Sequence, residues 1–281
     1  IDMKIGFVIA MAQVEPSPDA PANLEKARAI ADKAAAREAD LLVFPEMFMV
    51  PPAPERPPAR IAAEHGGAFA EGLAAVARQS GIAVAAGCWE EGPRTGRAYN
   101  VARIFSREGK EVAAYRKIHL FDALSVRESD TMTPGNLLPP VVELAGVRVG
   151  VAICYDLRFP ELFRYLALQG AQVILVPSAW YQGPVKEVHW TTLLQARAIE
   201  NTLYVAGCNL VGASFCGRSA LFDPFGIQVI GAGEGEELLV GTVCADRISA
   251  VRKKLPSLEN RRLSIDRLQL GPELQRTGGA E

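Results

Sequence analysis

The 281-residue sequence lacks the features that mark several special classes of protein. Its longest apolar runs have the length of β-strands and fall short of the ~20 residues that a membrane-spanning helix requires. No secretory signal, internal repeat or low-complexity linker is visible, and we expect the native chain to start at Met3. The net charge is −2, and the basic residues form no stripe. We therefore expect neither a membrane nor a nucleic acid as a partner.

Cysteine and histidine are scarce and irregularly spaced. None of the five cysteines forms a Cys-x-x-Cys pair, which argues against a disulfide framework and favours a reducing, cytoplasmic location. His65 and His189 are isolated, whereas zinc needs three or four convergent ligands. We therefore expect no metal and no other cofactor.

Strand-like apolar runs alternate with helical segments along the chain. This alternation predicts an α/β fold, and two stacked sheets in one domain would account for the number of strands. The Pro-rich segment Pro51–Pro58 and the segment Asp122–Pro140 are expected to be loops. Helices are expected at Asn23–Arg37, Gly67–Ser80, Pro160–Gln169, Val185–Asn201 and Ile248–Lys254. Strands are expected at Met3–Val14, Leu41–Pro45, Ile82–Trp89, Ala98–Phe105, Glu111–Arg116, Val147–Ile153, Val173–Val176, Leu203–Cys208, Ser219–Phe222, Gln228–Gly231 and Leu238–Ala245.

Three of these strands end in side chains that suit nucleophilic catalysis. The strand Val147–Ile153 leads directly to Cys154, and two other strands lead to Glu46 and Lys117. A lone cysteine is ordinarily an inert core residue. The prediction of a catalytic site therefore depends on all three residues lying at strand ends. Because ligands of α/β sheets bind beyond the carboxyl ends of strands, we expect the thiol, carboxylate and ammonium to meet there.

The chemistry assigns each of these groups a role. A thiol with a pKa of about 8.5 is mostly protonated at neutral pH and needs a base to become a nucleophile. Glu46 would take the proton. Lys117 would hold Glu46 in place and, with the backbone N–H of Tyr155, would stabilise the oxyanion formed when the thiolate adds to a carbonyl.

The sequence around these residues resembles the carbon–nitrogen hydrolase family, also called the nitrilase superfamily. The resemblance runs through Phe44-Pro45-Glu46, Tyr99-Asn100, Arg116-Lys117-Ile118-His119-Leu120-Phe121, Cys154-Tyr155-Asp156-Leu157-Arg158-Phe159-Pro160-Glu161-Leu162, Pro177-Ser178-Ala179-Trp180 and Gly217-Arg218-Ser219-Ala220 to Gly226. It implies a four-layer α-β-β-α sandwich in a single domain over residues 3–265, with residues 266–281 as a C-terminal tail. It also implies a Glu-Lys-Cys triad of Glu46, Lys117 and Cys154.

The residues after Cys154 are similar to those of the omega-amidase and Nit-type branch. Glu128 matches a second glutamate of the family, whereas the segment Ala123–Arg127 is shorter than its equivalent in many omega-amidases. The resemblance implies an amidase that hydrolyses a small primary amide to acid and ammonia through a thioester. Arg158 would bind a carboxylate of that substrate, or else form an ion pair that holds the turn. Trp180 would line the pocket or belong to the core.

Several alternatives stay open. The same triad would also serve hydrolysis of an N-carbamoyl compound or a nitrile, and a non-catalytic interaction protein can share the fold. His119 is a second candidate for the general base, but we favour Glu46 for this role. We expect Asp156 to be a turn residue and not a catalytic acid. The resemblance further implies a homodimer or larger homo-oligomer, paired through the helices beside the Cys154 strand.

Overall fold

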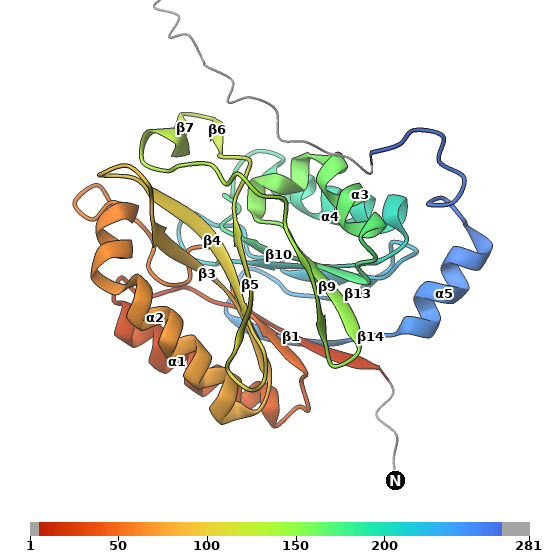
Figure 1. Ribbon diagram of the computed structural model, residues 1–281, viewed down its shortest axis with the longest axis horizontal. Helices are drawn as coiled ribbons and strands as arrows, with labels where there is room; N and C mark the ends of the chain where they lie inside the picture. The colour runs from red at the N-terminus through yellow and green to blue at the C-terminus, as the bar shows by residue number, and fades with distance from the viewer. Residues whose placement is uncertain (1–5, 266–281) are drawn as a thin grey trace, which may run out of the picture.

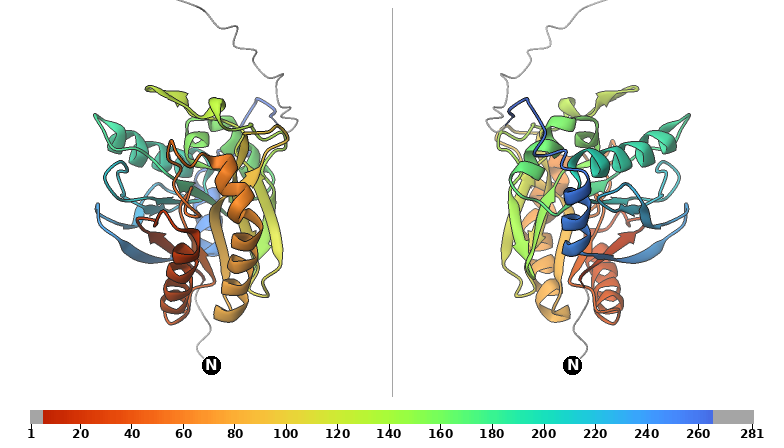
Figure 2. Two further views of the ribbon diagram at one scale, coloured as in Figure 1. Left: turned by 90° about the vertical axis from the view of Figure 1, so that its left-hand side faces the viewer. Right: turned by 90° about the vertical axis from the view of Figure 1, so that its right-hand side faces the viewer.

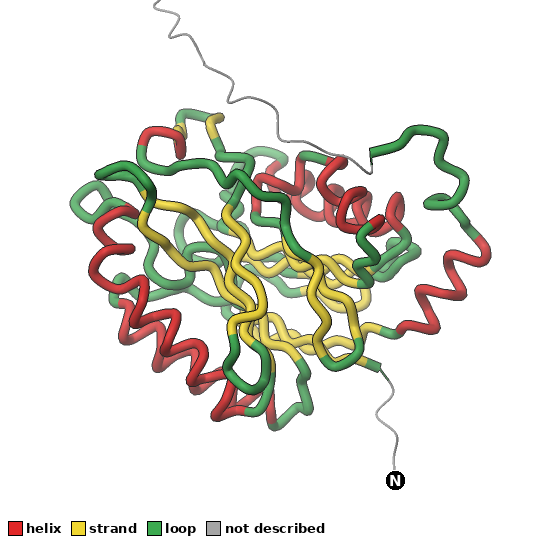
Figure 3. The backbone as a smooth tube through the Cα atoms, in the orientation of Figure 1, coloured by secondary structure: helices red, strands yellow, loops and turns green. Residues whose placement is uncertain are grey.

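The computed structural model describes residues 6–265 and shows two β-sheets packed face to face, with helices on both outer sides (Figures 1 and 2). Figure 3 shows the strands gathered in the centre and the helices outside them. The predicted four-layer α-β-β-α sandwich in one domain is thus confirmed. The predicted start at Met3 and the tail at 266–281 lie outside the described residues. None of the helices within 6–265 combines the length and apolar character needed to span a membrane.

The first sheet has six strands in the order β14-β1-β2-β3-β4-β5. Neighbouring strands β1, β2 and β3 are parallel, while β14, β4 and β5 join antiparallel. Helices α1 (Ala20–Ala35) and α2 (Pro58–Ser80) cover its outer face. The strands are β1 (Phe7–Gln13), β2 (Leu41–Val43), β3 (Ala83–Glu91), β4 (Ala98–Phe105), β5 (Glu111–Arg116) and β14 (Glu237–Val243).

The second sheet also has six strands, in the order β13-β12-β11-β10-β9-β8. Its centre, β9-β10-β11, is parallel. Helices α3 (Pro160–Leu168) and α4 (Lys186–Asn201) cover it, and α5 (Ala245–Lys254) follows β14. The strands are β8 (Val141–Leu144), β9 (Val147–Val151), β10 (Val173–Ser178), β11 (Tyr204–Asn209), β12 (Ala220–Phe222) and β13 (Gln228–Gly231).

The alternation of side chains along each strand divides the interior into three apolar layers. In β1, Ile9 and Met11 face the space between the sheets, while Ala10 and Ala12 face the helices. The same alternation in β10 sends Leu175 inward and Ile174 toward α3 and α4. Because both faces of the central strands are buried, these strands read as continuous apolar runs in the sequence.

Helix α2 begins at Pro58, so the prediction of a helix from Gly67 placed its start about two and a half turns too late. A proline fits the first turn because its missing N–H would have no partner inside the helix there. Pro58, the last residue of the predicted loop, is therefore also the first residue of the helix. Ile61 and Phe69 continue the buried stripe through Gly66 and Gly67, whose helix-weakening effect the packing overrides.

The predicted loop at Asp122–Pro140 holds a two-stranded hairpin, β6 (Asp122–Ala123) with β7 (Val126–Arg127), and a 3₁₀ turn at Glu128–Asp130. Leu124 and Ser125 at the hairpin tip both have positive φ, at 52° and 66°, as a two-residue hairpin turn requires. The hairpin delivers Glu128 to the interior of the protein.

Candidate active site

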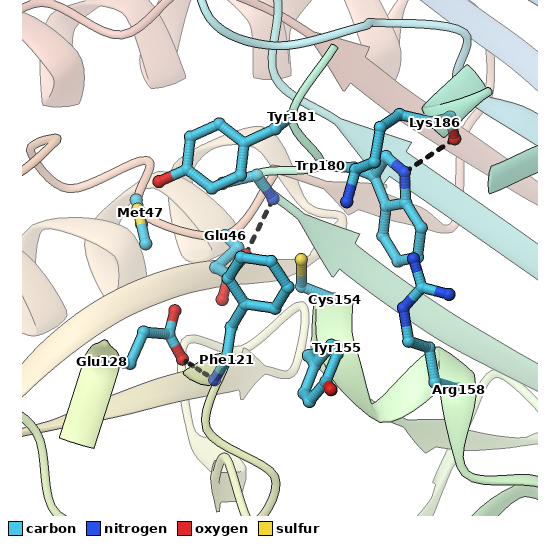
Figure 4. Close-up of a pocket in the computed structure, with 11 residues that line it drawn as sticks. Glu46, Met47, Phe121, Glu128, Cys154, Tyr155, Arg158, Trp180, Tyr181 and Lys186 are labelled. Carbon is cyan, nitrogen blue, oxygen red and sulfur yellow. Dashed lines mark hydrogen bonds between the residues drawn. The ribbon is translucent and has the colours of Figure 1, made fainter. Parts of the chain in front are cut away.

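The ends of β2, β5, β9 and β10 lie at one edge of the sandwich, where Glu46, Lys117 and Cys154 come together with Glu128. Figure 4 shows Glu46, Glu128 and Cys154 in this region. The Nζ atom of Lys117 is 2.9 Å from Oε1 of Glu46 and 2.9 Å from Oε2 of Glu128. Only 1% of Glu46 and 1% of Lys117 is exposed. The convergence expected from the strand ends is therefore present in the structure.

The carboxylate of Glu46 is held by three donors from three elements. Its Oε1 accepts from Nδ2 of Asn100 at 2.7 Å and from Lys117, and its Oε2 accepts from the backbone N–H of Ala179 at 2.8 Å. These bonds satisfy a buried charge and fix its orientation.

Lys117 stands between two carboxylates. Both oxygens of Glu128 lie within 3.1 Å of its Nζ atom, and Glu128 also accepts from the backbone N–H of Phe121 at 2.7 Å. Burial disfavours the ammonium, but Glu128 and Glu46 outweigh it and hold the pKa of Lys117 well above the ordinary lysine value. Burial and the nearby Glu46 raise the pKa of Glu128, although Lys117 opposes this shift. The two carboxylates thus favour the ammonium form of Lys117.

Cys154 opens a 3₁₀ turn, Cys154–Arg158, immediately before α3. Its φ of 44° lies in the left-handed region, which costs on the order of 1–3 kcal/mol for a side-chain-bearing residue. Burial and the negative charge of Glu46 raise the pKa of the thiol well above the ordinary cysteine value, although Lys117 opposes the shift. The resting group is therefore a thiol, and a base must remove its proton before it can attack.

Asp156 ties this turn to the segment that carries Lys117. Its Oδ2 accepts from the backbone N–H of Ile153 at 2.8 Å and from the hydroxyl of Tyr115 at 2.9 Å. Its Oδ1 lies 2.7 Å from Nδ1 of His119, whose ring stacks on Phe159. Asp156 is a turn residue, as expected. His119 bonds to Asp156 behind the turn and does not line the pocket.

An open pocket of about 320 Å³, which includes some solvent space, lies beside these groups. Its other wall contains the three predicted substrate-binding residues, Tyr155, Arg158 and Trp180. Trp180 meets both expectations, because it is 2% exposed in the core yet one edge of it lines the pocket. The Cζ atom of Arg158 lies 4.8 Å from the centroid of the Trp180 ring. Within residues 6–265, Arg158 forms no ion pair that would hold the turn.

Sequence reasoning missed several pocket residues, notably Lys186 at the first position of α4, together with Met47, Phe121 and Tyr181. A signal for Lys186 existed. It precedes Trp190 and Leu194 by four and eight residues, so a lysine occupies the buried stripe of the helix. Asn100 was noted within a motif, but its bond to Glu46 depends on β3 and β4 pairing and could not be read from spacing.

Across residues 6–265, no group of three or more His, Cys, Asp and Glu side chains is arranged to hold a metal ion. His65 lies near Glu64 on α2, and His189 lies near Arg158 with 3.5 Å between Nδ1 and the guanidinium. The five cysteines, all among the described residues, are free thiols.

Comparisons with known proteins agree with this fold and site. Residues 8–253 match the carbon–nitrogen hydrolase family. The chain is 35% identical over 268 residues to a deaminated glutathione amidase from Synechocystis sp. PCC 6803, covering 91% of this chain and 98% of that protein. It is 33% identical over 276 residues to an omega-amidase from Saccharomyces cerevisiae, covering 92% and 94% of the two chains.

A solved structure extends the similarity to the reacting group. A variant of the amidase from Nesterenkonia sp. AN1 superposes with a TM-score of 0.79 at 29% identity, covering 92% of this chain and 94% of that one. That structure shows covalent addition of the acetamide moiety of fluoroacetamide at its active-site cysteine. A half-buried thiol, two glutamates and a lysine at the strand ends of the two sheets are groups that suit hydrolysis of a carbon–nitrogen bond by a cysteine. The chain belongs to the carbon–nitrogen hydrolase family and is an amidase of the nitrilase superfamily.

Proposed function

We propose that this amidase acts on small carboxylate-bearing primary amides, with Cys154 as nucleophile, Glu46 as general base and Lys117 as oxyanion donor. Glu46 takes the proton of the Cys154 thiol, and the sulfur forms a bond to the amide carbon. The contact between Lys117 and Glu46 at 2.9 Å is the observation that carries this assignment, because it places a fixed cation beside the base.

The rest of the cycle follows from the same groups. Lys117 and the backbone N–H of Tyr155 stabilise the oxyanion of the tetrahedral adduct. As the adduct collapses, the carbon–nitrogen bond breaks, the proton held by Glu46 passes to the nitrogen, and ammonia leaves. Glu46 then takes a proton from water, whose oxygen attacks the thioester. The acid departs and the thiol regains its proton. Glu128 holds Lys117 throughout.

The carboxylate on the substrate is supported by Arg158, which lies on the wall opposite the glutamates. A guanidinium binds a carboxylate through two parallel hydrogen bonds and would orient the amide toward the thiol. The names of the two relatives, a deaminated glutathione amidase and an omega-amidase, support an amide as the substrate.

A screen with identified products tests this proposal. Glutaramate, pentanamide, deaminated glutathione, an N-carbamoyl amino acid and a nitrile are each incubated with the parent protein and with Cys154→Ala. We expect ammonia from glutaramate, an acyl adduct on Cys154 in mass spectra of quenched samples, and no turnover by Cys154→Ala. Release of carbon dioxide from the N-carbamoyl amino acid, or turnover of the nitrile, at a higher rate than ammonia release from glutaramate would favour these alternative substrates. No turnover of any compound would favour a non-catalytic protein.

An adduct on another cysteine, with activity surviving in Cys154→Ala, would overturn the assignment of the nucleophile. Cys244→Ala is the matched control, because Cys244 is also partly exposed but does not line the pocket. Its activity should equal that of the parent.

A further inference from the structure

Lys186 is a buried cation in the pocket without an anionic partner. It is 7% exposed, and its Nζ atom lies 4.7 Å from the centroid of the Trp180 ring and 5.2 Å from that of Phe121. Among the described residues, no carboxylate forms an ion pair with Lys186 and no acceptor forms a hydrogen bond with its Nζ atom. Figure 4 shows the amino group turned toward the space beside Cys154.

Such a group is costly inside a protein. A buried charge without a partner is unfavourable, and the faces of Trp180 and Phe121 compensate for only part of the lost hydration. The fold nevertheless fixes this lysine, because its backbone carbonyl accepts from Nε1 of Trp180 at 2.9 Å at the start of α4. The arrangement therefore calls for an anion supplied by a ligand.

A second cation stands against the same tryptophan. The guanidinium of Arg158 lies 4.8 Å from the Trp180 ring centroid and lines the same pocket. Burial and the charge of Arg158 lower the pKa of Lys186 below the ordinary lysine value, although Cys154, Cys216 and Glu187 oppose the shift. Two cations beside one ring disfavour each other's charge. A carboxylate placed with them would relieve both this repulsion and the missing ion pair.

The other end of the pocket has the opposite charge. Glu46 and Glu128 are both held there around Lys117, so a substrate anion is repelled from the catalytic end and attracted to the far end. This polarity orients an amide with one carboxylate in a single direction, with its carbonyl at Cys154.

We propose that Lys186 is a specificity-determining residue, which with Arg158 forms a two-cation subsite for the distal carboxylate of the acyl chain. The inference rests on the proposed function and narrows its substrate class to monoamides of short dicarboxylic acids. Lys186 acts on binding and orientation. It takes no part in bond making at Cys154.

The test compares kcat/KM for glutaramate and for pentanamide, which replaces the carboxylate by a methyl group. In the parent enzyme we expect glutaramate to be preferred. Lys186→Met should lower the ratio of the two kcat/KM values at least 10-fold, and Lys186→Arg should keep most of the preference because it keeps the charge. Lys33→Met, which removes an exposed lysine on α1, is the matched control and should leave the ratio unchanged.

A role at the oxyanion predicts a different result. Lys186→Met would then lower kcat for both amides by the same factor, and the ratio would stay constant, which would overturn the proposal. A parent ratio near one with an unchanged ratio in the variant would also overturn it, while leaving the amidase assignment intact. Failure of the parent to hydrolyse either amide would instead count against the proposed function.

A second measurement does not depend on the fold of a Lys186 variant. In Cys154→Ala protein, binding of glutaramate at alkaline pH should be accompanied by proton uptake, because the bound carboxylate restores the charge of Lys186. Titration calorimetry in buffers of different ionisation enthalpy measures this uptake. Glutaramate binding without proton uptake across the alkaline range would contradict the subsite.

Discussion

A Cβ atom added to Gly87 would lie 2.5 Å from the Cα of Glu46. It would also lie 2.6 Å from the carbonyl oxygen of Pro45 and 2.8 Å from the backbone nitrogen of Met47. Real Cβ atoms do not approach backbone this closely. The turn that presents Glu46 therefore packs on β3 only because residue 87 has no side chain, and a glycine with no chemical role fixes the position of the base.

Replacement of Gly87 by alanine should displace Glu46 more than it disturbs the fold. Because misplacement of a reacting group by about 1 Å can lower a rate by ~10²-fold, we expect kcat for glutaramate to fall at least 10-fold in Gly87→Ala. Steady-state kinetics and thermal unfolding of the same preparation check this. Gly67→Ala, in α2 with nothing within 4 Å of the added atom, is the control and should keep full activity. Equal activities of the two variants would show that the turn relocates freely.

The buried charges at the strand ends should respond differently to substitution. Glu46→Gln keeps the shape but removes the base, so the rate of acylation in a single turnover should fall about 10²-fold or more. Lys117→Arg keeps the charge, but Lys117 is only 1% exposed and contacts both Glu46 and Glu128, so the larger planar guanidinium does not fit. We therefore expect this variant to be inactive.

Glu128→Gln should cause an intermediate loss of activity, because it removes the negative charge of one of the two carboxylates that contact Lys117. Near-parental rates in Glu46→Gln or Lys117→Arg would contradict the triad.

Asp156→Asn should lower both the free energy of unfolding and the kcat of the enzyme. The carboxylate accepts from Ile153, Tyr115 and the backbone N–H of His119, and an amide would turn an NH₂ group toward at least one of these donors. Loss of a buried bond of this kind costs about 1–3 kcal/mol. Chemical denaturation measures the loss, and kcat should fall in parallel because the Cys154 turn loosens. Asp32→Asn, on the exposed side of α1, should change neither quantity. Unchanged stability in Asp156→Asn would show that the turn is held by packing alone.

The strand ends could be read from the sequence because two independent signals coincide there. Apolar runs of strand length ended directly before Glu46, Lys117 and Cys154, and the resemblance to a known family placed Glu128 beside them. The fold followed from the same alternation of strands and helices.

Other features depend on packing between distant segments. The spacing of Lys186 to Trp190 and Leu194 indicates a buried position on its helix. Its place in the pocket was not readable, because it reaches Cys154 from a different layer of the sandwich and no spacing in the sequence relates the two. Strand β8 (Val141–Leu144) was missed because it is only four residues long and follows a pair of prolines. The turn that follows β8 consists of Ala145 and Gly146, which both have positive φ. In the sequence, only the glycine indicates such a hairpin turn.

The expected self-association has a candidate surface on α4. Val188 and Ile199 are 56% and 41% exposed, and Phe225 and Ile227 from the adjoining turn are 51% and 56% exposed. Gly226, between Phe225 and Ile227, lies against Ile199, so the turn adjoins the helix at this point. We propose that two copies pair through this face. Light scattering after size exclusion should give a dimer or larger species for the parent and a monomer for the double variant Val188→Glu, Ile199→Glu. The control Leu137→Glu, at an apolar residue 73% exposed in another loop, should keep the parental mass. A monomeric parent would remove the proposal.

The last prediction concerns the pH dependence of substrate preference. Burial and Arg158 lower the pKa of Lys186 in the free enzyme, whereas a bound carboxylate favours the ammonium and raises that pKa in the complex. Below the lowered pKa, Lys186 is charged in both states and binding of the charged amide does not vary with pH through this group. As the pH rises between the two pKa values, binding must be accompanied by proton uptake, and KM for glutaramate should increase by up to about 10-fold per pH unit. KM for pentanamide has no such linkage.

The ratio of the two KM values is therefore the quantity to measure, since it cancels any titration at Cys154 or Glu128 that affects both amides. It should rise with pH in the parent and in Lys33→Met, and stay flat in Lys186→Met. A rise of equal size in Lys186→Met would assign the titration to another group.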